Sequence, residues 1–282
     1  MNVLVMLIRR EFWENRVLVI APVVVCVLYF LLFVLGSANF HLGSVYVADG
    51  GASAATITSV MHIMFTGMLY LLTAIVTFFY LCDSLYSERK DRSILFWKSL
   101  PVSDAMTVVS KLLVALIAVP LVVFVLSVVT HVCVLLAAKV VGLFYPPRFP
   151  ASHWTMAAWL RLNGYLFIDV FVLALWYAPI AAYQLLMSVV APRAVFVCTV
   201  LPPLVLIFGQ KVLTGSWSIG EFVLYRLGGV SLGGSLSGGL DAAIDGLDAL
   251  PMLRLPGLWI GVAVAAVLVF AAIRVRRHRD DS

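Results

Sequence analysis

Charged residues are scarce in this chain of 282 residues: they make up 12% of it, against roughly 25% in an average soluble domain. Hydrophobic residues make up 63%, and the mean hydropathy is +1.08. A soluble fold of this length could not bury so much apolar surface, so the composition indicates a protein surrounded largely by hydrocarbon. We therefore expect one all-α membrane domain over residues 1–282.

Motifs for catalysis and for nucleotide or metal binding are also lacking. The sequence has no G-x-x-x-x-G-K-[ST] phosphate-binding loop, no H-E-x-x-H zinc motif and no C-x-x-C pair among its four cysteines. No cluster of basic and aromatic residues indicates nucleic-acid binding. We therefore expect no enzymatic activity, no metal site and no cofactor in the chain itself.

Six apolar runs are each long enough to cross a bilayer as a helix of about 20 residues. They lie near residues 17–38, 60–82, 108–137, 163–190, 194–213 and 257–275. Backbone polar groups in lipid must bond within their own segment, so the runs predict helices and not strands. Kinks are expected at the prolines inside these runs, which are Pro22, Pro120, Pro179, Pro202 and Pro203.

The distribution of basic residues predicts the orientation of the spans. With the N-terminus inside, 13 of the 19 Lys and Arg residues fall on the inner side, which leaves 6 outside. Cytoplasmic segments carry such an excess, so both termini and residues 83–107 are expected inside and residues 214–256 outside. Lys111, near the inner end of its span, is expected to extend its ammonium group to the interface.

Two short helices are expected on the outer side. Ser152 would cap a helix over 153–160, and the S-x-x-E pattern from Ser218 to Glu221 fits a capping box for a helix that Gly228 ends. Tryptophan and tyrosine side chains in both segments favour positions at the lipid headgroups, so we expect these helices to lie flat on the outer surface.

Three polar residues inside or near the spans are candidates for a substrate pathway: Asp169, His62 and Gln184. Asp169 is the sharpest candidate, because a carboxylate in lipid costs about 2.5–3.5 kcal/mol on insertion scales. It either lines or gates a pathway, bonds a neighbouring helix, or stays a neutral acid near the outer interface. Hydrogen bonds between helices also explain His62 and Gln184.

The stretch SERKDRSILFWKSLPVS, residues 87–103, is a dense mixed-charge segment between apolar runs and contains an aromatic patch. A helix is expected over 83–99, stopped by Pro101, and Ser103 is expected to cap the next helix with Asp104 in its first turn. An apolar patch with a charged rim is typical of a protein interface. The alternative is that the apolar side chains pack on the membrane surface.

The run LYSERKDRSILFWKSLPVSD, with REFWENR before the first span, resembles the permease subunits of type-two ATP-binding-cassette exporters. The six-span plan fits that family over essentially the whole chain. The resemblance implies that residues 1–16 form an interfacial elbow helix and that 83–107 hold a coupling helix, which docks on an ATPase subunit. The implied elbow residues are Arg10, Glu11, Trp13 and Arg16, and the implied docking residues are Glu88, Arg89, Lys90, Asp91, Arg92, Phe96, Trp97, Lys98, Leu100 and Pro101.

The resemblance further implies an exporter of the bacterial inner membrane, in which separate ATPase subunits bind ATP and Mg. A second copy of the chain, or a related permease, would complete the pathway. The few charges in the spans favour lipid-like, peptide or amphipathic cargo over small ions. The alternative is a membrane scaffold or sensor that partners an ATPase without transport; a membrane enzyme would need converging titratable groups.

Glu11 departs from the pattern of a simple amphipathic elbow. It falls on the same helical face as four apolar residues, where a surface-lying helix would carry only apolar side chains: Leu4, Leu7, Ile8 and Phe12. We therefore expect a protein partner for this carboxylate.

Overall fold

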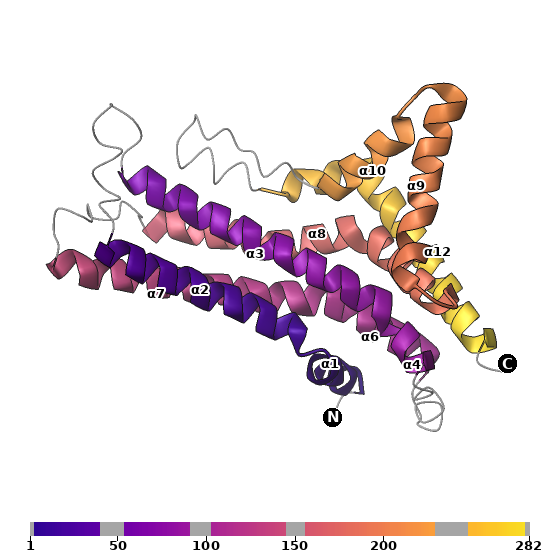
Figure 1. Ribbon diagram of the computed structural model, residues 1–282, viewed down its shortest axis with the longest axis horizontal. Coiled ribbons are helices and arrows are strands. Elements are labelled where there is room, and N and C mark those ends of the chain that lie inside the picture. The colour runs from indigo at the N-terminus through magenta and orange to yellow at the C-terminus, as the bar shows by residue number, and fades with distance from the viewer. Residues whose placement is uncertain (1–2, 40–53, 91–102, 145–155, 229–247, 280–282) are drawn as a thin grey trace.

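A computed structural model describes residues 3–39, 54–90, 103–144, 156–228 and 248–279, and all regular structure within these ranges is helical (Figure 1). The elements are α1 (Val3–Glu14), α2 (Val17–Asn39), α3 (Ala54–Ser84), α4 (Tyr86–Lys90), α6 (Asp104–Leu113), the π-helix η1 (Val114–Ala118), α7 (Val119–Phe144), α8 (Met156–Val190), α9 (Val195–Thr214), α10 (Ser218–Gly228), the 3-10 helix η4 (Leu250–Arg254) and α12 (Pro256–Arg279).

Six helical stretches in the described part of the chain are long and apolar enough to cross a membrane. They cover residues 17–36, 62–90, 104–141, 159–190, 195–214 and 256–278. The expected all-helical class and number of candidate spans are thereby confirmed. The chain is an integral membrane protein by length and composition of its helices.

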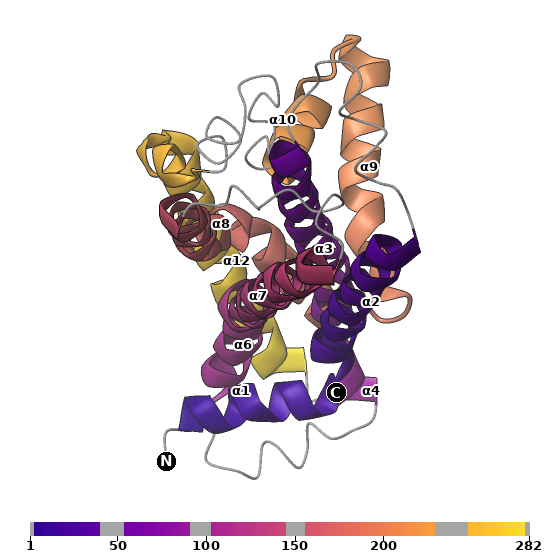
Figure 2. The same ribbon diagram turned by 90° about the vertical axis from the view of Figure 1, so that its left-hand side faces the viewer.

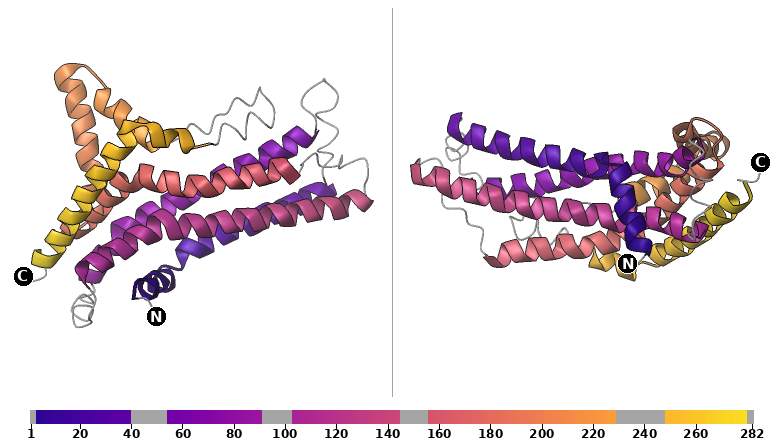
Figure 3. Two further views of the ribbon diagram at one scale, coloured as in Figure 1. Left: turned by 180° about the vertical axis from the view of Figure 1, so that it is seen from behind. Right: turned by 90° about the horizontal axis from the view of Figure 1, so that it is seen from below.

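Four long helices, α2, α3, α7 and α8, run alongside one another, while α9 and α12 diverge from them at one end (Figures 1 and 3). The short helix α1 lies across that same end, where both termini are found (Figure 2). Apolar side chains cover the outside of the bundle; on α2, for example, Leu28, Leu32 and Leu35 are all more than half exposed. This arrangement is the one expected when the outer surface faces lipid.

The third and fourth spans are longer than a bilayer requires. At 1.5 Å per residue, the 35 residues of α8 extend about 52 Å, against a hydrocarbon thickness of about 30 Å. The helical path from α6 through η1 to α7 is likewise continuous from Asp104 to Phe144. The π-helix ends two residues before Pro120, whose ring crowds the carbonyl four residues earlier, so the wider turn lies where a regular helix would clash.

The structure corrects three sequence expectations about helix ends. Residues 156–160 belong to the first turns of α8 and do not form a separate outer helix. The helix expected over 83–99 is interrupted at Leu85, because the Ser188 hydroxyl of α8 accepts the amides of Leu85 and Tyr86, each at 3.1 Å. Helix α10 is capped by Gln210 of α9, whose Oε1 accepts the Ile219 amide at 2.8 Å, in place of the expected capping box.

Two apolar clusters hold the diverging helices together. One lies towards the end with the termini and includes Leu85, Val108, Leu185 and Ala272, from four parts of the chain. The other packs η4 and α12 on α8 around the fully buried Trp176. Together, the two clusters pack α6 and both ends of α12 against α8.

Candidate functional site

Six charged side chains meet at the end of the bundle that holds both termini. They are Arg10 and Glu11 of α1, Glu88 of α4, Asp104 and Lys111 of α6, and Arg276 of α12, and together we call them the charge cluster. Three are cations and three are carboxylates, so their formal charges cancel. Four of the six are at most 7% exposed, so the pairing takes place largely out of water.

Glu11 is the most deeply buried member, with an exposed fraction of 0%. Its Oε1 accepts hydrogen bonds from Lys111 Nζ at 2.9 Å and from Arg10 Nη2 at 2.7 Å. Its Oε2 accepts one from the hydroxyl of Tyr80 on α3 at 2.9 Å. The carboxylate thus has its partners within the chain, from three different helices, which explains why it lies on the apolar face of α1.

Glu88 joins the same cluster from the opposite side. Its Oε1 lies 3.0 Å from Lys111 Nζ and 3.1 Å from Arg10 Nη2, and its Oε2 lies 3.0 Å from Arg276 Nη1. The Nε of Arg276 bonds Asp104 Oδ1 at 3.1 Å. Glu88 therefore connects α4 to α1, α6 and α12 at once.

Burial and neighbouring charges have opposite effects on the pKa values of ionisable side chains in and beside the charge cluster. Burial by itself lowers the pKa of Arg10, but the carboxylates of Glu11 and Glu14 outweigh it and raise that pKa above its usual value. Burial raises the pKa of Glu14 against the opposing pull of Arg10. Each buried charge in such a network depends on its partners, because an unpaired ion in a low-dielectric interior is costly.

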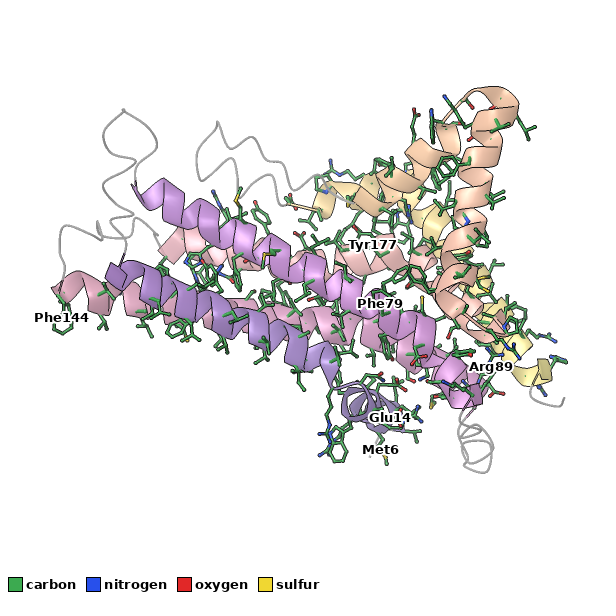
Figure 4. The ribbon with its side chains drawn as sticks, viewed as in Figure 1. Met6, Glu14, Phe79, Arg89, Phe144 and Tyr177 are labelled. Atoms are coloured by element: carbon green, nitrogen blue, oxygen red, sulfur yellow. The ribbon has the colours of Figure 1, made fainter. Side chains whose placement is uncertain are left out.

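A second set of contacts ties α4 to the connection between α8 and α9. Arg89 Nη2 donates to the carbonyls of Ser188 at 2.8 Å and Ala191 at 2.9 Å, which lie at the C-terminal end of α8. A cation at a helix C-terminus also interacts favourably with the helix dipole. Figure 4 shows Arg89 and Glu14 at the end of the bundle that carries both termini. A displacement of α4 would therefore act on α1, α6, α8 and α12.

The expected docking residues divide into two groups. Glu88 and Arg89 are turned into the chain as described, and Lys90 is exposed. The remaining ones lie outside the described residues: Asp91, Arg92, Phe96, Trp97, Lys98, Leu100 and Pro101. The expected start of the next helix is confirmed, since Ser103 Oγ accepts the Met106 amide at 3.2 Å and Asp104 lies in the first turn.

The four residues implied for the elbow differ in their surroundings. Arg10 and Glu11 face the charge cluster, whereas Trp13 is 67% exposed and Arg16 is also exposed. The guanidinium of Arg9 lies 5.0 Å from the centre of a Trp13 ring, within the range of a cation–π contact. Helix α1 therefore has one face bonded into the bundle and one face directed outwards.

The three pathway candidates do not come together within the chain. Asp169 Oδ1 accepts the Ala249 amide at 3.1 Å, which matches the alternative of a structural partner. His62 Nδ1 lies 3.3 Å from the Tyr29 hydroxyl, and its ring packs edge-on against that of His131. Gln184 is buried on α8, 15 residues and thus about 22 Å along the helix from Asp169.

Lys111, Arg276 and Tyr80 belong to the site but were missed as functional residues. The expectation that Lys111 extends to the interface is wrong, because its side chain is 2% exposed and bonds Glu11 and Glu88. The only sequence signal for these partners is Glu11 itself, since a carboxylate on an apolar face requires a cation nearby.

Within the described ranges, no group of three or more His, Cys, Asp or Glu residues is placed to hold a metal ion. Comparison of the chain with protein-family models, with curated proteins and with solved structures gives no match.

Proposed function

We propose that the chain is the membrane-spanning subunit of an ATP-driven exporter of the type-two ATP-binding-cassette class. In this proposal a separate ATPase subunit binds ATP and Mg and docks on residues 88–101, and α1 is the elbow helix. A second copy of the chain, or a related permease, completes the pathway in a bacterial inner membrane. Six candidate spans and the resemblance of residues 85–104 and 10–16 to that family support the assignment.

The observation that carries the proposal is the position of Glu88. It stands at the start of the proposed docking segment, yet its carboxylate bonds cations on α1, α6 and α12. A force applied to residues 88–101 would therefore reach three other helices through one side chain. Coupling between two sites requires an element of this kind, whose arrangement both sites can influence.

The burial of Glu88 within the chain and the aromatic character of residues 96 and 97 suggest different roles for them. The charged side chain of Glu88 transmits the movement of the docking segment to the other helices. The aromatic pair Phe96 and Trp97 supplies the energy of docking on the ATPase subunit. Buried aromatic anchors at interfaces cost about 2 kcal/mol or more on truncation, which corresponds to roughly 30-fold weaker binding. Glu88→Gln would leave docking intact and weaken transmission, because it removes the charge that holds three cations together.

The test uses the full chain co-expressed with its ATPase subunit and reconstituted in liposomes. Phe96→Ala with Trp97→Ala is expected to lose the ATPase subunit on purification. Glu88→Gln is expected to retain it but to lose most ATP-driven transport. Asp83→Asn is the matched control, because Asp83 is exposed at the end of α3, is not a member of the charge cluster, and should leave both properties unchanged.

Two results would contradict the proposal. Full ATPase binding and full transport in the double aromatic variant would remove residues 88–101 from the docking role and favour packing of their apolar side chains on the membrane. ATPase binding without any ATP-driven transport by the unmodified complex would point instead to a non-transporting scaffold or sensor.

A further inference from the structure

Arg226, at the C-terminal turn of α10, is a second buried cation that the charge cluster does not include. Its exposed fraction is 6%. Its Nη1 donates to the Gly257 carbonyl of α12 at 3.0 Å, and its guanidinium carbon lies 4.3 Å from the centre of a Trp176 ring. The Trp176 Nε1 donates in turn to the Arg226 carbonyl at 3.0 Å. We call Arg226, Trp176, Gly257 and Gly261 the arginine seat.

Gly261 of α12 makes room for the guanidinium, while Gly257 supplies a backbone carbonyl to it. Gly257 and Gly261 are four residues apart and therefore share a face of the helix. A Cβ atom on Gly261 would lie 1.9 Å from Arg226 Nη2, so no larger residue fits there unless the arginine moves. In membrane helices this G-x-x-x-G spacing usually lets another helix approach closely. Here the second glycine of the pair, Gly261, admits a charged side chain.

The charge of Arg226 is poorly compensated by the part of the chain that the structure describes. No carboxylate in that part forms an ion pair with it, and Nη2 is buried without a hydrogen-bond partner. Burial lowers the pKa of Arg226. Buried charges in proteins are almost always paired, and a ring face with one neutral carbonyl is a weak substitute for an anion. An anionic oxygen would form a stronger, charge-assisted bond with the same guanidinium.

The surface around the seat is apolar. Phe222, Leu224, Tyr225 and Leu227 of α10 are each more than half exposed. Tyr177 lies where α8 meets the hairpin of α9 and α10 (Figure 4), and its hydroxyl donates to the Leu227 carbonyl at 3.1 Å. A ligand with a negatively charged head and long apolar chains would match both features, because its chains would cover α10 while its head met the arginine.

We propose that Arg226 binds a phosphate oxygen of an anionic phospholipid whose acyl chains cover the exposed face of α10. The oxygen replaces the bond to the Gly257 carbonyl and satisfies Nη2, while the guanidinium stays on the Trp176 ring. The long, flexible arginine side chain reaches such a position by rotating within the space that Gly261 leaves. This site is independent of ATPase docking and of the proposed transport function.

The test measures the melting temperature of the purified full chain in a neutral sugar detergent, with added phosphatidylglycerol, phosphatidylcholine or inorganic phosphate. A single-site ligand at tenfold excess over its dissociation constant raises the melting temperature of a chain of this size by roughly 2–3 °C. We expect that rise with phosphatidylglycerol alone. Native mass spectrometry should show one retained phosphatidylglycerol molecule that depends on Arg226.

Three variants assign the effect to the seat. Arg226→Met should lose the rise, and Gly261→Ala should lose it as well, although the positive charge remains, because the added methyl group displaces the guanidinium. Arg254→Gln is the matched control: Arg254 lies on η4 close in sequence to α12, is exposed, and should leave the rise unchanged. If Arg226→Met fails to fold, the melting temperature of Gly261→Ala and the mass spectrum of the bound lipid still show whether phosphatidylglycerol binds at the arginine seat.

An unchanged rise in both seat variants would overturn the proposal. An equal rise with phosphatidylcholine would show that the anionic head is not recognised and would also overturn it. An equal rise with inorganic phosphate would overturn the lipid as the source of the oxygen and would assign the seat to a free anion.

Discussion

The charge cluster and the arginine seat bury charge in opposite ways. In the cluster, three cations and three carboxylates from four elements pair so that their formal charges cancel. In the seat, one guanidinium rests on a tryptophan ring and one backbone carbonyl, without a carboxylate paired to it in the described ranges. Lys111 and Arg226 are nonetheless buried to a similar extent, at 2% and 6% exposure.

The difference shows that burial alone does not decide how much a charge contributes to stability. Removing a member of a paired network leaves its partners charged, buried and unsatisfied, which costs several kcal/mol. Removing an unpaired cation leaves no such partner and relieves its own desolvation cost. Two lysine or arginine residues of equal burial should therefore respond very differently to replacement by methionine.

The largest effect is expected for Lys111→Met. The ammonium group bonds both Glu11 and Glu88, so its loss leaves two buried carboxylates short of a cation. We expect the free energy of unfolding to fall by about 3–5 kcal/mol, as for other broken buried pairs. Denaturant unfolding in neutral detergent measures this, with the exposed Lys90→Met as control. A loss similar to that of the control would contradict the pairing.

A double replacement should recover part of this loss. Glu11→Gln removes one of the carboxylates that Lys111→Met leaves unpaired, so the two losses should not add. We expect the double variant to be about 2 kcal/mol more stable than the sum of the single changes, within the range of coupled neighbours. Added salt should alter this coupling little, because buried pairs are weakly screened. Strict additivity would mean that the two side chains act independently.

Gly261→Ala should destabilise the chain by about 1–2 kcal/mol, because it displaces Arg226 from the Trp176 ring and from the Gly257 carbonyl. In an Arg226→Ala background the same change should instead stabilise by about 0.5–1 kcal/mol, since alanine is the better helix former. Gly261→Ala should therefore change the free energy of unfolding in opposite directions in the two backgrounds. Equal destabilisation in both backgrounds would show that the helix backbone, and not the arginine, resists the methyl group.

The smallest effect is expected for Arg226→Met in neutral detergent. Methionine fills a similar apolar volume, and no described carboxylate is left unpaired, so the free energy of unfolding should change by less than about 1 kcal/mol. Thermal and denaturant unfolding of Arg226→Met and Lys111→Met, measured under the same conditions, compares the two losses of stability directly. A loss as large as that of Lys111→Met would erase the distinction between the two sites.

Much of the fold follows from local sequence. The six apolar runs correspond to the six candidate spans, and Ser103 caps α6 as expected. Element ends that depend on distant contacts were not predicted in this way. The interruption at Leu85 depends on Ser188, about a hundred positions later in the chain, and the cap of α10 depends on Gln210 of the preceding helix.

The candidate site was predicted only in part. Glu11 stood out because a carboxylate on an apolar helical face requires a partner, but nothing in the local pattern named Lys111 and Tyr80 as the side chains that bond it. Arg276 was one of several basic residues near the C-terminus, and its bond to Glu88 spans 188 positions. Pairing at such separations depends on how helices pack, which periodicity does not encode.

The sequence by itself determined that the chain is helical and surrounded by lipid, because hydrogen bonding within each apolar run and the lack of charge leave no other solution in a membrane. The tertiary structure decided which charges are compensated. The crossing of α1, α4, α6 and α12 brings opposite charges together at one end of the bundle, whereas the approach of α10 to α12 brings Arg226 to two glycines and a tryptophan ring. Identical residue types therefore acquire different roles, because the energy of a buried charge is set by its neighbours in space.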